Sequence, residues 1–123
     1  MQPVFAIHEH ELKPECHIER YEKEVGAAIE EMNIAGLLEA HFLKGFKGER
    51  SGRYAVLWFF ENEEAILNNF GTPANPKWPD KWLVYENEIL AKYLVCHPDK
   101  IKFTDKMISG GEMAENTNYL KSR

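Results

Sequence analysis

The most apolar and aromatic segment of the chain is residues 53–60, with the sequence RYAVLWFF. Successive side chains of a β-strand point to opposite faces, so a strand with one face in water alternates apolar and polar residues. This segment does not alternate, because Leu57 and Phe59 fall on one face while Val56, Trp58 and Phe60 fall on the other. Its length and its β-branched and aromatic content predict a strand that is covered on both faces.

The rest of the pattern predicts three more strands and three helices. Alternating apolar positions indicate strands at residues 4–12, 37–46 and 101–109. Apolar positions that recur every three or four residues indicate helices at residues 15–33, 61–70 and 81–94. The order β-α-β-β-α-β, with one extra helix, predicts an α+β fold with a ferredoxin-like antiparallel sheet and helices on one of its faces.

Two segments fall outside these elements. Glycine and prolines mark residues 71–80 as a loop, in which Trp78 is expected to cover a cavity mouth or to fix the loop to the domain. Residues 111–123 are polar and weakly patterned, and are expected to fray or to bind a neighbouring chain. The sequence therefore predicts one domain, residues 1–110, followed by a polar C-terminal tail, residues 111–123.

The two faces of the predicted sheet differ in composition. The face expected under the helices carries mainly apolar residues: Phe5, Ile7, Leu38, Ala40, Phe42, Ala55, Leu57, Phe59, Ile101 and Phe103. The other face mixes large aromatic and ionisable residues: His8, His10, Glu39, His41, Tyr54, Val56, Trp58, Phe60, Lys102, Thr104 and Lys106. Leaving these aromatic rings in water would expose a large apolar patch, and burying the charges without partners would cost free energy. A second copy of the sheet laid across this face predicts a homodimer with a partly polar cavity in each subunit.

Composition narrows the class of protein. The 123 residues suit one domain, and a hydrophobic fraction of 44% with 28% charged residues is ordinary for a globular protein. No apolar run approaches the roughly 20 residues of a membrane span, and no signal peptide is seen. Two cysteines are too few for a disulfide scaffold, so a cytoplasmic location is expected. The net charge of −5 argues against nucleic acid as a partner.

Ionisable residues on the mixed face suggest chemistry on a small molecule. Imidazole and carboxylate groups transfer protons, and they are also metal ligands. We expect His8 or His10 to be the general base, His41 and Tyr54 to orient the substrate, and Trp58 to stack on it. Further substrate contacts are expected from Glu39, Phe60, Lys102 and Thr104. The first two strands are expected to be separated by the third, so neither a metal site nor another cofactor is predicted.

The element order, the two-sided third strand and the helix that leads into the segment HPDKIKFTD resemble the dimeric α+β barrel superfamily. This group includes antibiotic-biosynthesis monooxygenase-like proteins and stress-responsive barrel proteins, and the resemblance covers about residues 3–109. It implies a homodimer, and it implies a cofactor-independent monooxygenase or isomerase that acts on a small aromatic or polyketide-like molecule. Haem-degrading members also exist, but no haem or flavin signature is visible in this chain.

Other classes fit parts of the pattern. A dimeric protein that binds a ligand without turnover, or that is purely structural, explains the same aromatic residues as the core of an interface. RNA-recognition modules share the element order, but they require aromatic residues at a spacing that this chain lacks. The segment HEHELKPE also matches the histidine and glutamate pattern of cupins, which are all-β proteins, and the helix predicted from residue 15 contradicts that context.

Overall fold

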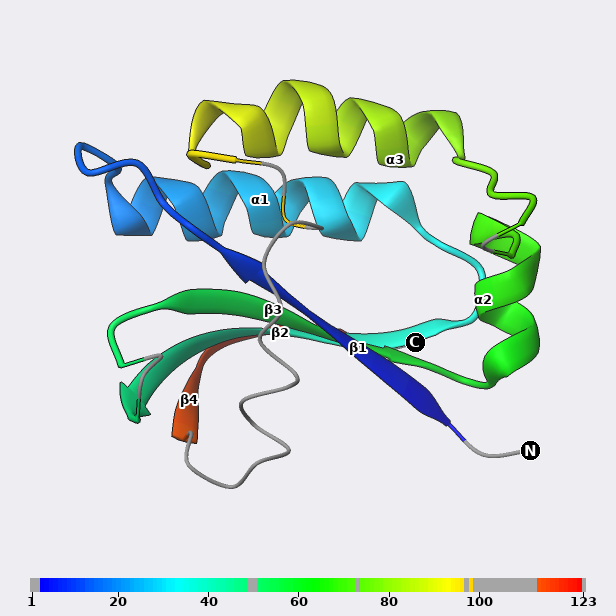
Figure 1. Cartoon of the computed structure of the whole chain (residues 1–123), viewed down its shortest axis with the longest axis horizontal. Helices are drawn as coiled ribbons and strands as arrows, with labels where there is room; N and C mark the ends of the chain where they lie inside the picture. The colour runs from blue at the N-terminus through cyan, green and yellow to red at the C-terminus, as the bar shows by residue number, and fades with distance from the viewer. Residues whose placement is uncertain (1–2, 49–50, 73, 97, 99–112, 123) are drawn as a thin grey trace.

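A computed structural model describes residues 3–48, 51–72, 74–96, 98 and the backbone of residues 113–122. The chain is an α+β protein in which helices cover one face of an antiparallel sheet (Figure 1). The strands are β1 (Val4–His10), β2 (Leu37–Lys47), β3 (Tyr54–Phe60) and β4 (Met113–Ser122). The helices are α1 (Ile18–Met32), α2 (Glu63–Phe70) and α3 (Asp80–Val84). A π-helical segment (Tyr85–Ile89) and a 3₁₀ turn (Leu90–Lys92) continue directly from α3, so we refer to all three as the 80–92 helix.

The sheet has the strand order β1-β3-β2-β4, and every pair of neighbours is antiparallel. β1 and β2 flank β3, with Ala6 of β1 and Ala40 of β2 both opposite Trp58. Because each is antiparallel to β3, β1 and β2 run parallel to each other. Residues 113–122 were expected to fray or to bind a neighbouring chain, but they form β4 along the outer edge of β2 in the same chain. The edge of β2 offers unpaired backbone groups, which a polar segment can pair as well as an apolar one. The strand predicted at residues 101–109 lies outside the described residues.

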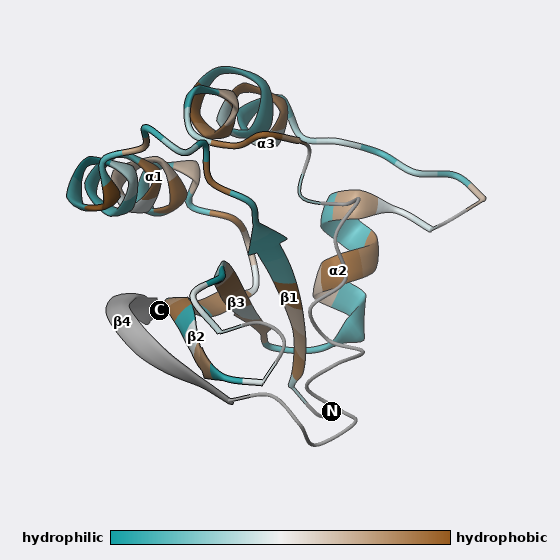
Figure 2. Ribbon diagram, turned by 60° about the vertical axis from the view of Figure 1, so that its left-hand side comes forward, coloured by the Kyte–Doolittle hydropathy of each residue, from teal (hydrophilic) through white to brown (hydrophobic). Residues whose placement is uncertain are grey.

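Local sequence explains where the helices begin and which side they bury. Asn62 accepts a hydrogen bond from the backbone N–H of Ala65 at 2.9 Å, so its side chain caps the N-terminus of α2. In α1, Tyr21, Val25 and Ile29 recur at four-residue steps and are fully buried against the sheet. Figure 2 shows α1 and α3 side by side on the same side of the sheet. In the same view α2 lies apart from this pair, near one edge of the sheet.

The helix-covered face of β1 and β3 is not the one that the sequence suggested. Trp58 and Phe60 belong to the main core with α1, and the His10 side chain contacts Tyr21 of α1. Phe5, in contrast, is 62% exposed. It lies with Phe59 on the face away from the helices, and their ring centres are 5.7 Å apart. Both strands carry apolar residues on both sides, so two-residue periodicity predicts the strands correctly but cannot decide which side faces the helices.

Candidate functional site

An aromatic pocket of about 200 Å³ lies between the helix-covered face of the sheet, α2 and α3. We call it the aromatic pocket, and its principal walls are His8 of β1, Trp58 and Phe60 of β3, Phe70 of α2, Trp82 of α3 and Trp78 of the preceding loop. These walls come from β1, β3, α2 and the segment that contains Trp78 and Trp82, so the pocket exists only in the folded protein. Its volume is below the roughly 300–1,000 Å³ of drug-sized sites, which suits a compound of about one ring.

The imidazole of His8 lies against two indole rings. Its ring centre is 6.1 Å from that of Trp58 and 6.4 Å from that of Trp82. The two indoles are themselves 5.3 Å apart, and Phe70 meets Trp82 edge-on at 5.0 Å. A half-buried imidazole in such apolar surroundings can hydrogen-bond a ligand, and it can accept a proton from one.

Two tryptophans of this pocket carry buried donors that have no hydrogen-bond acceptor within the described part of the chain. These donors are the indole N–H groups of Trp58 and Trp82. Leaving a buried donor unpaired costs about 1–3 kcal/mol, so most native proteins leave few such groups. Both donors belong to residues of the aromatic pocket, but the nitrogen atoms themselves are covered by neighbouring atoms and do not border its open space.

His10 and Tyr54 do not line the pocket and instead lie next to Tyr21 of α1. His10 is 1% exposed, and its Nδ1 lies 2.7 Å from the hydroxyl of Tyr21, whose ring is 6.2 Å from that of Tyr54. Burial, and then the positive charge of nearby His8, lowers the pKa of His10 to about 3. Burial also raises the pKa of the Tyr21 hydroxyl well above its ordinary value. Both groups are therefore neutral at physiological pH, and they form a buried support between β1 and α1.

His41 and Glu39 lie on the opposite face of the sheet. The Nε2 atom of His41 is 2.8 Å from a carboxylate oxygen of Glu39, and the His41 ring meets Phe59 edge-on at 6.2 Å. The expectation that His8, His10 and His41 share one wall is therefore wrong. The register explains the error, since Ala40 lies opposite Trp58 and so shares its face, which places His41 on the other one.

The remaining predicted site residues have different outcomes. Lys102 and Thr104 lie outside the described residues, whereas Phe60 lines the aromatic pocket together with His8 and Trp58. Within the described ranges, no group of three or more His, Cys, Asp and Glu side chains is arranged to hold a metal ion. The predicted site residues that the structure describes therefore fall into three groups. Residues of the aromatic pocket are His8, Trp58 and Phe60, the buried residues next to it are His10 and Tyr54, and the residues of the opposite sheet face are Glu39 and His41.

Trp82 is the pocket residue whose role the sequence did not reveal. The apolar residues of the predicted helix at 81–94 lie almost all round it, a pattern typical of a helix that contacts more than one surface. In the structure, Trp82 packs on Trp58 of the sheet and on Phe70 of α2. Trp78 lines the same pocket, and its ring centre lies 6.3 Å from that of Phe70; this contact fits either of its expected roles, as a cover or as the residue that fixes the loop to the domain.

No family model, no curated protein and no solved structure matches this chain. Among the helices of the described residues, none combines the length and the apolar composition needed to cross a membrane.

Proposed function

We propose that this protein binds a small aromatic or polyketide-like molecule in the aromatic pocket and acts on it as a cofactor-independent isomerase or monooxygenase. The observation that carries the proposal is the position of His8, whose imidazole lies against Trp58 and Trp82 on the wall of the pocket. Indole faces favour a planar ligand, and the imidazole supplies the proton-transfer group of that pocket.

In this reaction His8 takes a proton from a phenol or from a carbon next to a carbonyl group. The resulting anion is delocalised over the ring that stacks on the indoles. An isomerase returns the proton to a different carbon. A monooxygenase lets the anion react with dioxygen, so that a CH₂ group becomes a carbonyl group and the second oxygen atom leaves as water.

The second sheet was expected across the face of Trp58 and Phe60, but that face packs on α1 in the main core. The fold that we propose is therefore a ferredoxin-like homodimer, with the two sheets facing each other across the side opposite the helices. It is supported by the apolar residues of that side, since the exposed ring of Phe5 lies against Phe59, while Ile7 and Leu57 pack on Leu43 and Ala55. His41 and Glu39 would then lie in the space between the two sheets, separate from the aromatic pocket.

A ligand-binding protein without turnover is the second candidate. It is favoured by the composition of the aromatic pocket, because His8 is the one ionisable side chain among the described residues that line it. A substrate that needs both a base and a separate acid would find only one such group there.

Two variants separate these functions. Deuterium exchange from D₂O into cyclohexanone reports proton abstraction, and dioxygen uptake with 1,3-cyclohexanedione, whose CH₂ group lies between two carbonyl groups, reports oxygenation. His8→Gln is expected to slow whichever reaction occurs by about 100-fold or more, while His41→Gln, on the opposite face, is the matched control and keeps the wild-type rate. Equal rates for His8→Gln and wild type would overturn the catalytic proposal. Binding of phenol that depends on His8, without turnover of either compound, would favour the second candidate.

A further inference from the structure

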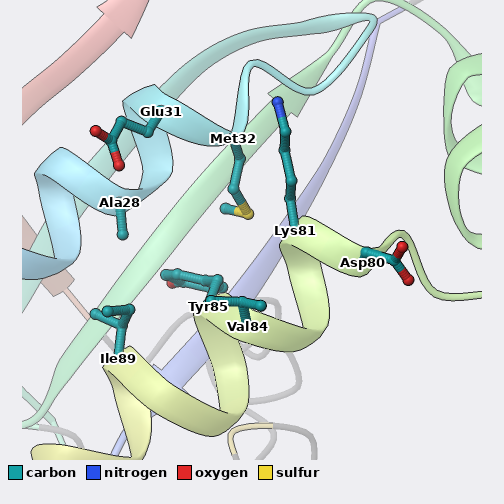
Figure 3. A pocket seen from close by; sticks show the side chains of 8 residues that line it. All are labelled: Ala28, Glu31, Met32, Asp80, Lys81, Val84, Tyr85 and Ile89. Atoms are coloured by element: carbon teal, nitrogen blue, oxygen red, sulfur yellow. The ribbon is translucent and has the colours of Figure 1, made fainter.

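A second pocket, of about 500 Å³, lies between α1 and the 80–92 helix (Figure 3). We call it the interhelical pocket, and its apolar walls are Ala28 and Met32 of α1 together with Val84, Tyr85 and Ile89. It shares no lining residue with the aromatic pocket. The Tyr85 ring lies between them, 6.1 Å from Trp58 and 5.2 Å from Trp82.

Tyr85 is the polar group of this pocket. Its side chain is 2% exposed, and its buried hydroxyl has no hydrogen-bond partner within the described part of the chain. Figure 3 shows the ring running from the 80–92 helix toward α1, with the oxygen at its far end between Ala28 and Ile89. Burial, and then the nearby carboxylate of Glu86, raises the pKa of this hydroxyl well above its ordinary value. It is therefore a neutral group that can both donate and accept a hydrogen bond.

The backbone gives a second, independent indication of a site. Tyr85 and Ile89, which line the pocket, are the first and last residues of the π-helical segment. π-helical turns are rare, and they occur frequently at functional sites because the wider turn changes which side chains meet. Here the wider turn includes both the unpaired hydroxyl and an apolar wall of the same pocket.

The charged residues at the edge indicate which ligands fit. Glu31, Asp80 and Lys81 line the pocket, but Figure 3 shows their charged ends directed away from its centre. The open space is therefore lined by apolar side chains, and the one neutral hydroxyl lies in its wall, covered by neighbouring atoms. A volume of about 500 Å³ lies within the usual range of roughly 300–1,000 Å³ for small-molecule sites.

We propose that the interhelical pocket binds a neutral, mainly apolar small molecule with one hydroxyl or carbonyl oxygen, which pairs with the hydroxyl of Tyr85. This site is separate from the aromatic pocket, and its occupancy does not depend on the function proposed for His8. The bound oxygen gives the Tyr85 hydroxyl the partner that the chain itself does not supply.

The test uses the full chain with ¹³C-labelled methionine methyl groups. Met32 lines the interhelical pocket and not the aromatic pocket, so its methyl signal, assigned with Met32→Leu, reports this site alone. The probes are cyclohexanol and methylcyclohexane, which have similar shapes but differ in the oxygen. The expected result is a saturable shift of the Met32 signal that occurs at lower concentration with cyclohexanol.

Tyr85→Phe is the decisive variant. It removes an unpaired buried hydroxyl, so the free protein should be as stable as wild type or slightly more stable. Cyclohexanol should bind about 2- to 10-fold more weakly, as expected for one lost neutral hydrogen bond, while the affinity for methylcyclohexane stays unchanged. Ala28→Leu, which fills the pocket, should abolish both shifts. The proposal is overturned if Tyr85→Phe binds cyclohexanol as tightly as wild type, or if neither probe shifts the Met32 signal of the wild-type protein.

Discussion

The Nδ1 atom of His10 and the hydroxyl of Tyr21 lie 2.7 Å apart in the buried layer between β1 and α1. The Nε2 atom of His10 is also buried, and it has no hydrogen-bond partner among the described residues. The Tyr21 ring is surrounded by Phe42, Tyr54 and Tyr93, with ring centres 5.3–6.2 Å away. This contact holds the strand that carries His8 against the helix layer, and it keeps a neutral histidine in the core.

The neutral state of His10 predicts a loss of stability in acid. Its pKa is about 3 in the folded protein and 6.5 in an unfolded chain, so between these values only the unfolded chain binds a proton at this site. Lowering the pH from 6.5 toward 3 therefore stabilises the unfolded state, by up to about 1.4 kcal/mol per pH unit from this group. Urea unfolding at pH 7, 6, 5 and 4 measures the slope.

The variant His10→Gln should reduce the slope of unfolding free energy against pH by up to about 1.4 kcal/mol per pH unit, which corresponds to the uptake of one proton on unfolding. The wild-type protein, measured at the same four pH values, is the reference for this comparison. An unchanged slope in His10→Gln would show that His10 is not the group responsible for the loss.

The buried carboxylate of Glu9 predicts a strong dependence on Arg53. Glu9 is fully buried on the face opposite the helices, and its Oε2 atom lies 3.0 Å from Nη2 of Arg53, whose side chain is 41% exposed. Arg53→Met should lower the free energy of unfolding by clearly more than 1 kcal/mol. The loss should stay below the roughly 3–5 kcal/mol of a fully buried pair, because the arginine is partly solvated.

An exposed ion pair serves as the comparison for Arg53→Met. Lys92 pairs with Glu24 at 2.5 Å, and both side chains are at least one-third exposed. Lys92→Met should therefore cost about 0–1 kcal/mol in the same urea unfolding experiment. Equal losses for the two variants would contradict the assigned burial of the Glu9 carboxylate.

The exposed ring of Phe5 marks the interface of the homodimer that we propose. If the proposed dimer forms through the face that Phe5 and Phe59 share, Phe5→Asp places a charge in that interface and should shift the protein toward monomer. Leu67→Asp is a matched control, since Leu67 is also exposed but belongs to α2. Sedimentation velocity measures both variants; a wild-type monomer, or equal effects of the two changes, would rule out this interface.

The sequence predicts the elements of this fold better than it predicts their faces. The helix expected at residues 15–33 is present as α1, and its buried residues follow the expected three- and four-residue spacing. The cap of α2 by Asn62 is likewise a local feature of the chain. Which face of β1 and β3 the helices cover depends on contacts with α1. One such contact joins His10 of β1 to Tyr21 of α1, two residues of separate elements. No periodicity within one strand contains that information.

The candidate site was predictable only in part, for the same reason. His8, Trp58 and Phe60 were expected on one wall, and they do line one pocket. Trp82 joins them because the 80–92 helix crosses the same face of the sheet, which is a tertiary contact without a sequence motif. The π-helical turn that begins at Tyr85 likewise has no signal in the local pattern of apolar residues.

The most direct test of the proposed function is a titration of the protein with phenol, followed through the ¹H–¹⁵N signals of the histidine side chains. His8 lines the aromatic pocket, while His41 lies on the opposite face of the sheet. We expect the His8 signals to shift and saturate while those of His41 stay in place. Trp82→Ala, which removes a pocket wall, should weaken this binding. Unchanged His8 signals at phenol concentrations that shift other residues would contradict the proposal that this pocket is the ligand site.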